Sequence, residues 1–189
     1  MVSAKTSLKF RKAHRYLGLF LGIQFLFWTI SGLYFSWTNL DEIHGDQFKK
    51  NKVQKEYKNL ISPSDLDYKD GIKTISLRDF NNVPYYWINS ELLVNALNGS
   101  VKDSITKQEA ISISNENILD KYKISLVEKI YEVGNHHEYR GRPLPAFVIS
   151  YEGTENLKSY VSALDGQFQT VRHRDWRWFD FLWMTHTMD

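Results

Sequence analysis

Residues 16–37 read YLGLFLGIQFLFWTISGLYFSW, a run without a single charged side chain. At about 1.5 Å per residue, a helix of this length crosses a hydrocarbon core of roughly 30 Å. A buried core helix seldom runs so far without a charge. A cleaved signal peptide needs small residues at its cleavage site, which Phe35, Ser36 and Trp37 do not offer. The stretch therefore predicts a transmembrane helix over 16–37.

The charges on the two sides of this span differ in sign. The first charged residues after it are acidic, Asp41 and Glu42, whereas the residues before it are basic: Lys5, Lys9, Arg11, Lys12 and Arg15. By the positive-inside rule, 1–15 is a cytoplasmic segment and the rest of the chain lies outside. Tyr16 and Trp37 stand where interfacial aromatic residues belong. We expect the inner membrane of a bacterium, with the main domain in the periplasm.

Composition excludes several classes of function. The 189 residues carry a formal net charge of only +2, and we see no basic cluster outside the N-terminus that would indicate nucleic-acid binding. Cysteine is absent, which excludes disulfides, thiolate zinc sites and cysteine nucleophiles. The chain has no phosphate-binding glycine loop, no G-x-S-x-G and no H-E-x-x-H motif. Hydrolase and nucleotide-binding functions are therefore not indicated.

Small residues recur along one face of the predicted span. Intervals of three or four place the following residues together, with His14 and Phe25 on the same face: Gly18, Gly22, Thr29, Gly32 and Ser36. Such a stripe lets a second helix approach closely. The alternative is that glycine is simply frequent in membrane helices. With one span in the chain, we expect the partner helix to come from another protein or from sequence beyond Asp189.

The remainder predicts an α+β domain. A polar connection covers 38–59, and the domain covers 60–172. Thr106 and Glu109 fit a capping box at the start of a helix over 105–113. Alternating apolar residues bounded by turn signals, such as Asn98-Gly99 and Asp165-Gly166, predict antiparallel strands. The expected strands are 74–77, 85–88, 92–96, 126–133, 146–151, 158–163 and 167–171.

Two of these stretches resemble a known domain. Residues 105–113, ITKQEAISI, and 160–168, YVSALDGQF, are similar to the helix and the closing hairpin of a PepSY domain, with Ser162 and Asp165 where the family more usually has Asp and Thr. Residues 94–99, VNALNG, resemble the same hairpin once more. The resemblance implies a helix packed on an antiparallel sheet, and two repeats of that unit.

The flanks resemble PepSY-associated membrane proteins. Residues 11–19, RKAHRYLGL, are similar to the H-R-W-L-G-L entry into their first helix, and 176–186, WRWFDFLWMTH, to the L-H segment before their second helix. We therefore expect 173–189 to be an aromatic segment at the membrane interface that leads into a second helix missing from the sequence. Some relatives in the wider family resemble siderophore-iron reductases, which hold haem between helices, so the resemblance implies haem b here.

Histidines at the two membrane boundaries are the candidate haem ligands: His14 inside, His44 and His186 outside. The 30 positions from His14 to His44 span about 45 Å if helical, so these two cannot bind one iron. His44 and His186 could. The alternative is that these side chains bind headgroups or backbone. The adjacent pair His136 and His137 is expected in an exposed loop, where nearby arginines could bind an anion: Arg140 and Arg142.

Two functions of different class follow. One is an accessory or haem-bearing subunit in transmembrane electron transfer to ferric or siderophore-bound iron, a component of a ferric reductase. The other is a binding or regulatory module that restrains or senses a periplasmic partner without catalysis. Membrane lipid and a partner transmembrane helix are expected in both, and nucleic acid in neither.

Overall fold

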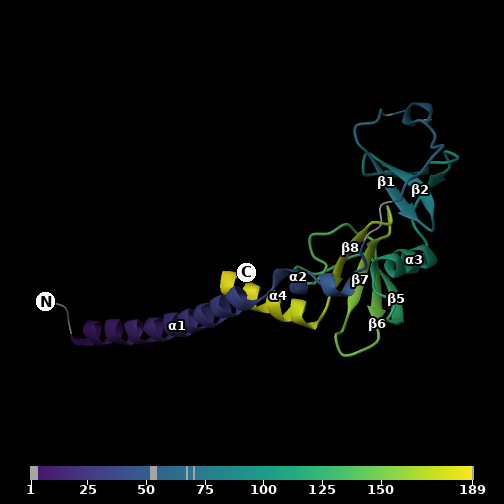
Figure 1. Ribbon diagram of the computed structural model, residues 1–189. Coiled ribbons are helices and arrows are strands. Elements are labelled where there is room, and N and C mark those ends of the chain that lie inside the picture. The colour runs from purple at the N-terminus through teal and green to yellow at the C-terminus, as the bar shows by residue number, and fades with distance from the viewer. Residues whose placement is uncertain (1–3, 52–54, 67, 70, 189) are drawn as a thin grey trace. The chain divides into compact units, whose positions relative to one another are not determined.

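The computed structural model describes residues 4–51, 55–66, 68–69 and 71–188, and the chain divides into two compact units (Figure 1). We call them the helical unit, which combines Met1–Ile43 with Asp175–Asp189, and the sheet unit, His44–Arg174. Each unit is built from segments with a distinct sequence pattern, and each is described separately below.

The helical unit is dominated by one long helix, α1 (Ala4–Trp37). Its segment Thr6–Trp37 is long enough and apolar enough to cross a membrane, and only 6% of its most apolar window is buried. A core helix of a globular protein would be mostly buried, so this observation supports membrane anchoring. The helix begins well before the predicted residue 16, because the basic residues that precede the apolar run are good helix formers.

Two shorter helices complete the helical unit. Helix α2 (Leu40–Ile43) follows α1 after a two-residue break, and α4 (Arg174–Thr187) covers most of the stretch expected at the membrane interface. A helix over residues 174–187 was not predicted. The regular spacing of the aromatic residues in this stretch could have indicated the helix.

The first sheet of the sheet unit is an antiparallel meander in the order β1-β2-β3-β4. Its turns use residues that tolerate a left-handed backbone, since Asn81 and Asn82 have φ values of 55° and 59° between β1 and β2. Strand β4 was not predicted, because two residues carry no periodicity. The strands are β1 (Ile75–Phe80), β2 (Val83–Ile88), β3 (Leu92–Asn95) and β4 (Val101–Lys102).

The second sheet repeats this order as β5-β6-β7-β8, again antiparallel throughout. Between the two sheets in the sequence lies α3 (Lys107–Asn117), and two 3-10 turns, η1 (Asp46–Phe48) and η2 (Pro63–Asp65), precede the first sheet. The strands are β5 (Ile124–Ile130), β6 (Ala146–Tyr151), β7 (Lys158–Ser162) and β8 (Phe168–Arg172).

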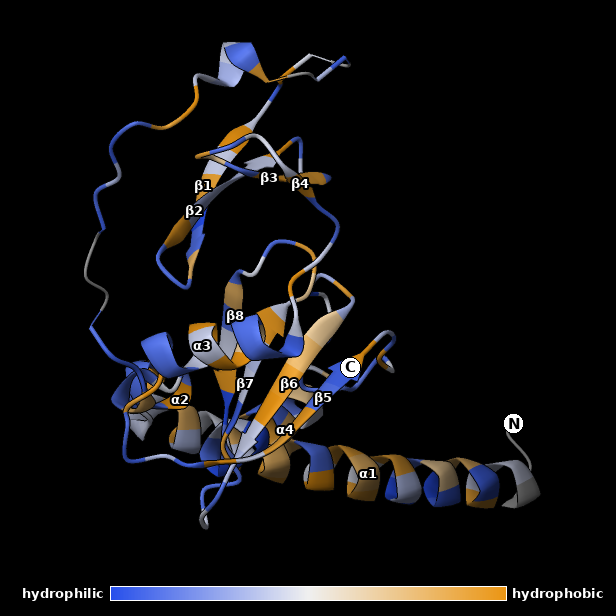
Figure 2. Cartoon of the chain, turned by 90° about the vertical axis from the view of Figure 1, so that its right-hand side faces the viewer, coloured by the Kyte–Doolittle hydropathy of each residue, from blue (hydrophilic) through white to orange (hydrophobic). Residues whose placement is uncertain are grey.

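Helix α3 covers the second sheet. The predicted capping box is present: Glu109 N–H donates to the Thr106 hydroxyl at 3.2 Å, and Thr106 N–H donates to the Glu109 carboxylate at 2.7 Å. The helix then buries Ala110 and Ile113 in a core shared with apolar residues of β6, β7 and β8. Figure 2 shows α3 across this sheet and β6 as a strongly apolar strand.

The fold is therefore α+β, as predicted, with an N-terminal apolar helix and two four-stranded antiparallel sheets. Two meanders of the same order are what two repeated units would give. The likeness to a PepSY domain and the repeat itself stay predictions.

Candidate functional site

His186 lies in the last full turn of α4 and is fixed against α1. The Ser31 hydroxyl oxygen and His186 Nδ1 are 2.7 Å apart, and the Trp28 indole N–H donates to the His186 backbone carbonyl at 2.8 Å. The Phe35 ring meets the imidazole edge-on, with 5.5 Å between ring centres. Three neighbouring residues of one helix face therefore hold both the ring and the backbone of this histidine.

The hydrogen bonds of Ser31 determine which imidazole nitrogen carries the proton. A serine has one hydroxyl proton. The Ser31 hydroxyl lies 2.7 Å from the Phe27 carbonyl, to which it donates. Both short contacts are hydrogen bonds only if His186 Nδ1–H donates to Ser31. The neutral ring then has its lone pair on Nε2, which has no hydrogen-bond partner within the described part of the chain.

The imidazole lies well inside the apolar run of α1. At about 1.5 Å per residue, Ser31 is roughly 9 Å from Trp37 and roughly 22 Å from Tyr16 along the helix axis. Ser31 is also only 2% exposed, whereas most apolar side chains of the same helix are largely exposed. If α1 spans a bilayer, His186 is deeper than the boundary position that the sequence indicated.

Aromatic rings hold α4 against the C-terminal half of α1. Phe35 contacts Phe179 and Trp183, with 4.9 Å and 5.6 Å between ring centres, in addition to His186. These α4 residues are spaced four and three apart and so share one helix face. Because Phe179 lies beside Phe35 and His186 reaches Trp28, α4 runs antiparallel to α1.

The small-residue stripe lies on a different face of α1. At 100° per residue, its centre is roughly 110° around the helix from the face formed by Trp28, Ser31 and Phe35. A Cβ atom added at Gly18, Gly22 or Gly32 would meet nothing within 4 Å among the described residues. Helix α4 is thus an intramolecular neighbour for one face and leaves the stripe uncovered.

The other two predicted haem ligands are exposed. His14 is on α1, 17 residues before Ser31, and this separation corresponds to roughly 25 Å along the axis. One iron cannot be bound by both His14 and His186. His44 is the first residue of the sheet unit. Its pairing with His186 stays a prediction.

The adjacent histidines lie in a turn, as expected for an exposed loop. His136 is exposed, and His137 Nδ1 accepts a hydrogen bond from the Tyr139 N–H at 3.1 Å. Nearby, Arg142 donates to the Gln169 carbonyl at 3.0 Å. Arg140 donates to the His137 carbonyl at 3.4 Å, so both arginines expected to bind an anion have a structural contact.

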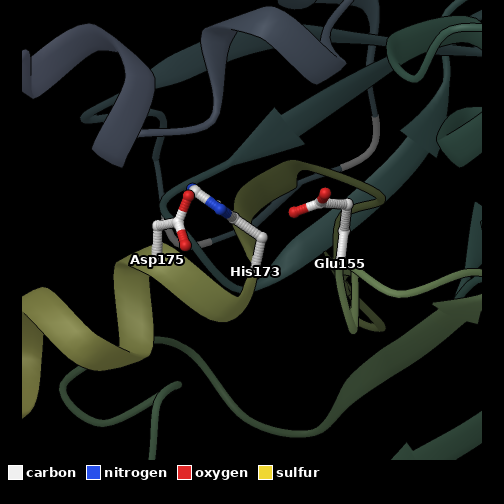
Figure 3. Close-up of side chains that lie close together, drawn as sticks. All are labelled: Glu155, His173 and Asp175. Atoms are coloured by element: carbon white, nitrogen blue, oxygen red, sulfur yellow. The ribbon is translucent and has the colours of Figure 1, made fainter.

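A second histidine that sequence reasoning left without a role is His173, which is 1% exposed and lies 4.9 Å from the Phe48 ring centre. Figure 3 shows it beside Glu155, and their ligand atoms lie within 4.8 Å of each other. Asp175, also drawn there, belongs to the helical unit. Two ligand atoms within the sheet unit fall short of the three or four that protein metal sites usually supply.

The sheet unit contains a cavity of about 670 Å³ with a mixed charged lining. In its wall, Lys55 Nζ lies 2.7 Å from an Asp79 oxygen and 3.3 Å from a Glu116 oxygen. The hydrogen bond to the Asp79 carboxylate raises the pKa of Lys55. Arg78, also in the wall, pairs with the nearly buried Asp165 at 2.8 Å. The charged and polar lining residues include Lys50, Lys55, Arg78, Asp79, Glu116 and Gln167.

Comparisons of the chain with protein-family models, with curated proteins and with solved structures find no match. The function is therefore inferred from the geometry of the sites.

Of these sites, the sequence indicated His186 but not the residue that holds it. Ser31 was absent from the predicted stripe because it lies on a different face of the helix. Its position between Trp28 and Phe35, at intervals of three and four, was the signal that could have indicated a shared face.

Proposed function

We propose that this protein is a membrane-anchored subunit of a transmembrane electron-transfer system, haem-bearing or accessory, that serves ferric or siderophore-bound iron outside the cytoplasm. The observation that carries the proposal is the geometry of His186. An imidazole with its Nδ1–H committed to Ser31 and its Nε2 lone pair unengaged is in the state required of an axial haem ligand.

The surroundings of His186 fit a haem. The ring lies beside the aromatic rings of Trp28 and Phe35, with 6.1 Å and 5.5 Å between ring centres. Haem b bound there would supply one-electron chemistry through its iron. In that case His186 would bind the iron through Nε2, and Ser31 would fix the orientation of its ring. The second ligand is assigned to His44 or to a histidine of a partner helix, and His14 is assigned to a separate haem on the inner side.

The proposed orientation is N-terminus in the cytoplasm of a bacterial inner membrane and sheet unit in the periplasm. It rests on the basic residues before the apolar run, of which Lys9, Arg11, Lys12 and Arg15 are exposed on α1. In this orientation the PepSY-like sheet unit faces the compartment in which ferric siderophores arrive.

A second candidate is a binding module that restrains or senses a periplasmic partner. The cavity bounded by Lys55, Arg78 and Asp79 favours it, because a concave site with polar groups of both signs is suited to recognition. In this case α1 only anchors the module.

Absorption spectroscopy of the purified full chain separates the two candidates. We expect a Soret band in the parent protein. The variant His186→Ala should retain less than about a tenth of it, because loss of a ligand weakens haem binding at least as much as the roughly 10–100-fold loss caused by removal of an outer-shell partner. The matched control His136→Ala should keep the full band. A parent without haem, or an unchanged band in His186→Ala, would transfer support to the binding module.

A further inference from the structure

Ser31 has an arrangement that differs from those of Thr29 and Ser36, two other hydroxyl residues of α1. Thr29 and Ser36 each donate to a carbonyl one turn earlier and are otherwise exposed, which is the usual way in which a hydroxyl is satisfied in an apolar helix. Ser31 makes the same backbone hydrogen bond, to Phe27. In addition it is buried and lies 2.7 Å from a ring nitrogen on another helix.

The hydrogen bond to the backbone determines whether Ser31 donates to His186 or accepts from it. While its proton is donated to Phe27, only the lone pairs of Ser31 Oγ face His186, and the oxygen acts as an acceptor toward the ring. An acceptor at this point favours the proton on Nδ1. The opposite arrangement, with Ser31 donating to Nδ1, would cost the 2.7 Å hydrogen bond to Phe27.

Trp28 fixes the same residue from a second point. The last carbonyls of a helix have no partner within it, and an indole N–H in an apolar setting needs an acceptor. The bond from Trp28 Nε1 to the His186 carbonyl satisfies both groups. With the backbone held by Trp28 and the ring held by Ser31, the imidazole cannot turn over without losing a contact.

We infer that Ser31 is the positioning residue of His186: it holds the imidazole in the Nδ1–H form, so that Nε2 is directed away from α1 as the metal-binding nitrogen. This inference rests on the proposed function for its biological role, but the protonation pattern it specifies exists without haem. Ser31 does not contact a substrate or the iron in this arrangement and acts only through His186.

The test begins with haem-free full chain in lipid bilayers, labelled with ¹⁵N at histidine. The His186 resonances are identified by their loss in His186→Ala, and ¹⁵N chemical shifts distinguish a protonated from an unprotonated ring nitrogen. We expect the proton on Nδ1 in the parent. In Ser31→Ala the ratio of the two forms should fall by about fivefold, the factor that corresponds to the net contribution of about 1 kcal/mol from one hydrogen bond.

Two variants control for packing. Ser31→Thr keeps the hydroxyl and should keep the parent ratio, and Ser36→Ala removes an equivalent hydroxyl from an exposed position of the same helix and should change nothing. With haem added, Ser31→Ala should bind it roughly 10–100-fold more weakly and with a shifted midpoint potential, because the outer-shell partner is lost.

A proton on Nε2 in the parent, or an unchanged ratio in Ser31→Ala, would overturn the inference. A parent that shows the expected Nδ1–H form and binds no haem would instead end the proposed function and leave the assignment of Ser31 in place.

Discussion

The glycines of the two units meet different surroundings. In the sheet unit, Gly166 has a φ of +69°, and a Cβ atom there would lie 2.9 Å from the Phe80 ring. In the helical unit, Gly18 and Gly22 have ordinary helical backbone and no neighbour within 4 Å of such a Cβ atom. The sheet unit thus uses glycine to complete its own packing. The helical unit presents glycine on a surface that the described residues leave open.

Buried hydroxyl groups show the same difference. Ser114, Tyr151 and Ser159 hydrogen-bond one another inside the sheet unit, and all three side chains are buried. The three hydroxyl protons can therefore all be donated within that group. The Ser31–His186 pair, in contrast, leaves one ring nitrogen without a partner in the described chain. Of these two buried hydroxyl sites, the one in the helical unit therefore keeps a ring nitrogen that could bind another group.

The largest effect on the free energy of unfolding is expected at Gly166. Gly166→Ala should lower the free energy of unfolding by about 2–5 kcal/mol, because a left-handed residue with a Cβ costs about 1–2 kcal/mol and overpacking against Phe80 about 1–3 kcal/mol. Gly141→Ala is the matched control: it has φ +71° and nothing within 4 Å of the added atom. Denaturant unfolding measures both losses. Equal losses in the two variants would show that contact between the added Cβ atom and Phe80 does not lower the stability.

A smaller effect of a different kind is expected at the stripe. Replacing Gly18 and Gly22 with Leu should leave unfolding of the chain unchanged, because neither position has a close neighbour. Association with a partner helix should weaken by about 1–3 kcal/mol, since a close contact has no room for the larger side chain. Crosslinking yield in membranes measures it, with Ile23→Leu, on the far side of α1, as control. Unchanged yields would reject the stripe as an interface.

Local signals in the sequence were sufficient for much of the fold. Thr106 and Glu109 specify the start of α3 through a capping box, and strand 146–151 was placed at its observed bounds because turn residues and alternation delimit it. Local sequence signals do not predict the tertiary contacts in this way. Helix α4 folds back along α1, and Ser31 rather than a stripe residue contacts His186. Both features depend on side chains that are 140 or more positions apart in the sequence.

The candidate site was therefore only half predictable. His186 stood out as a histidine within an aromatic segment that resembles the L-H motif of a family, while the state of its ring follows from a hydroxyl 155 positions away. Nothing in the spacing of either segment indicates this contact, because helical periodicity identifies a face and not what covers it.

The packing of α4 on α1 underlies both the proposed haem ligand and the role of Ser31, and the absence of cysteine makes it directly measurable. In lipid bilayers, a short bismaleimide should join the two thiols within one chain in Phe35→Cys/Phe179→Cys, whose parent rings are 4.9 Å apart. The pair Phe25→Cys/Phe179→Cys, with one thiol on the stripe face about 15 Å further along α1, should not be joined. Mass spectrometry of the digested protein identifies the product. We expect a crosslink in the first pair alone, whereas no crosslink there, or equal yields in both pairs, would show that α4 does not pack on this face of α1.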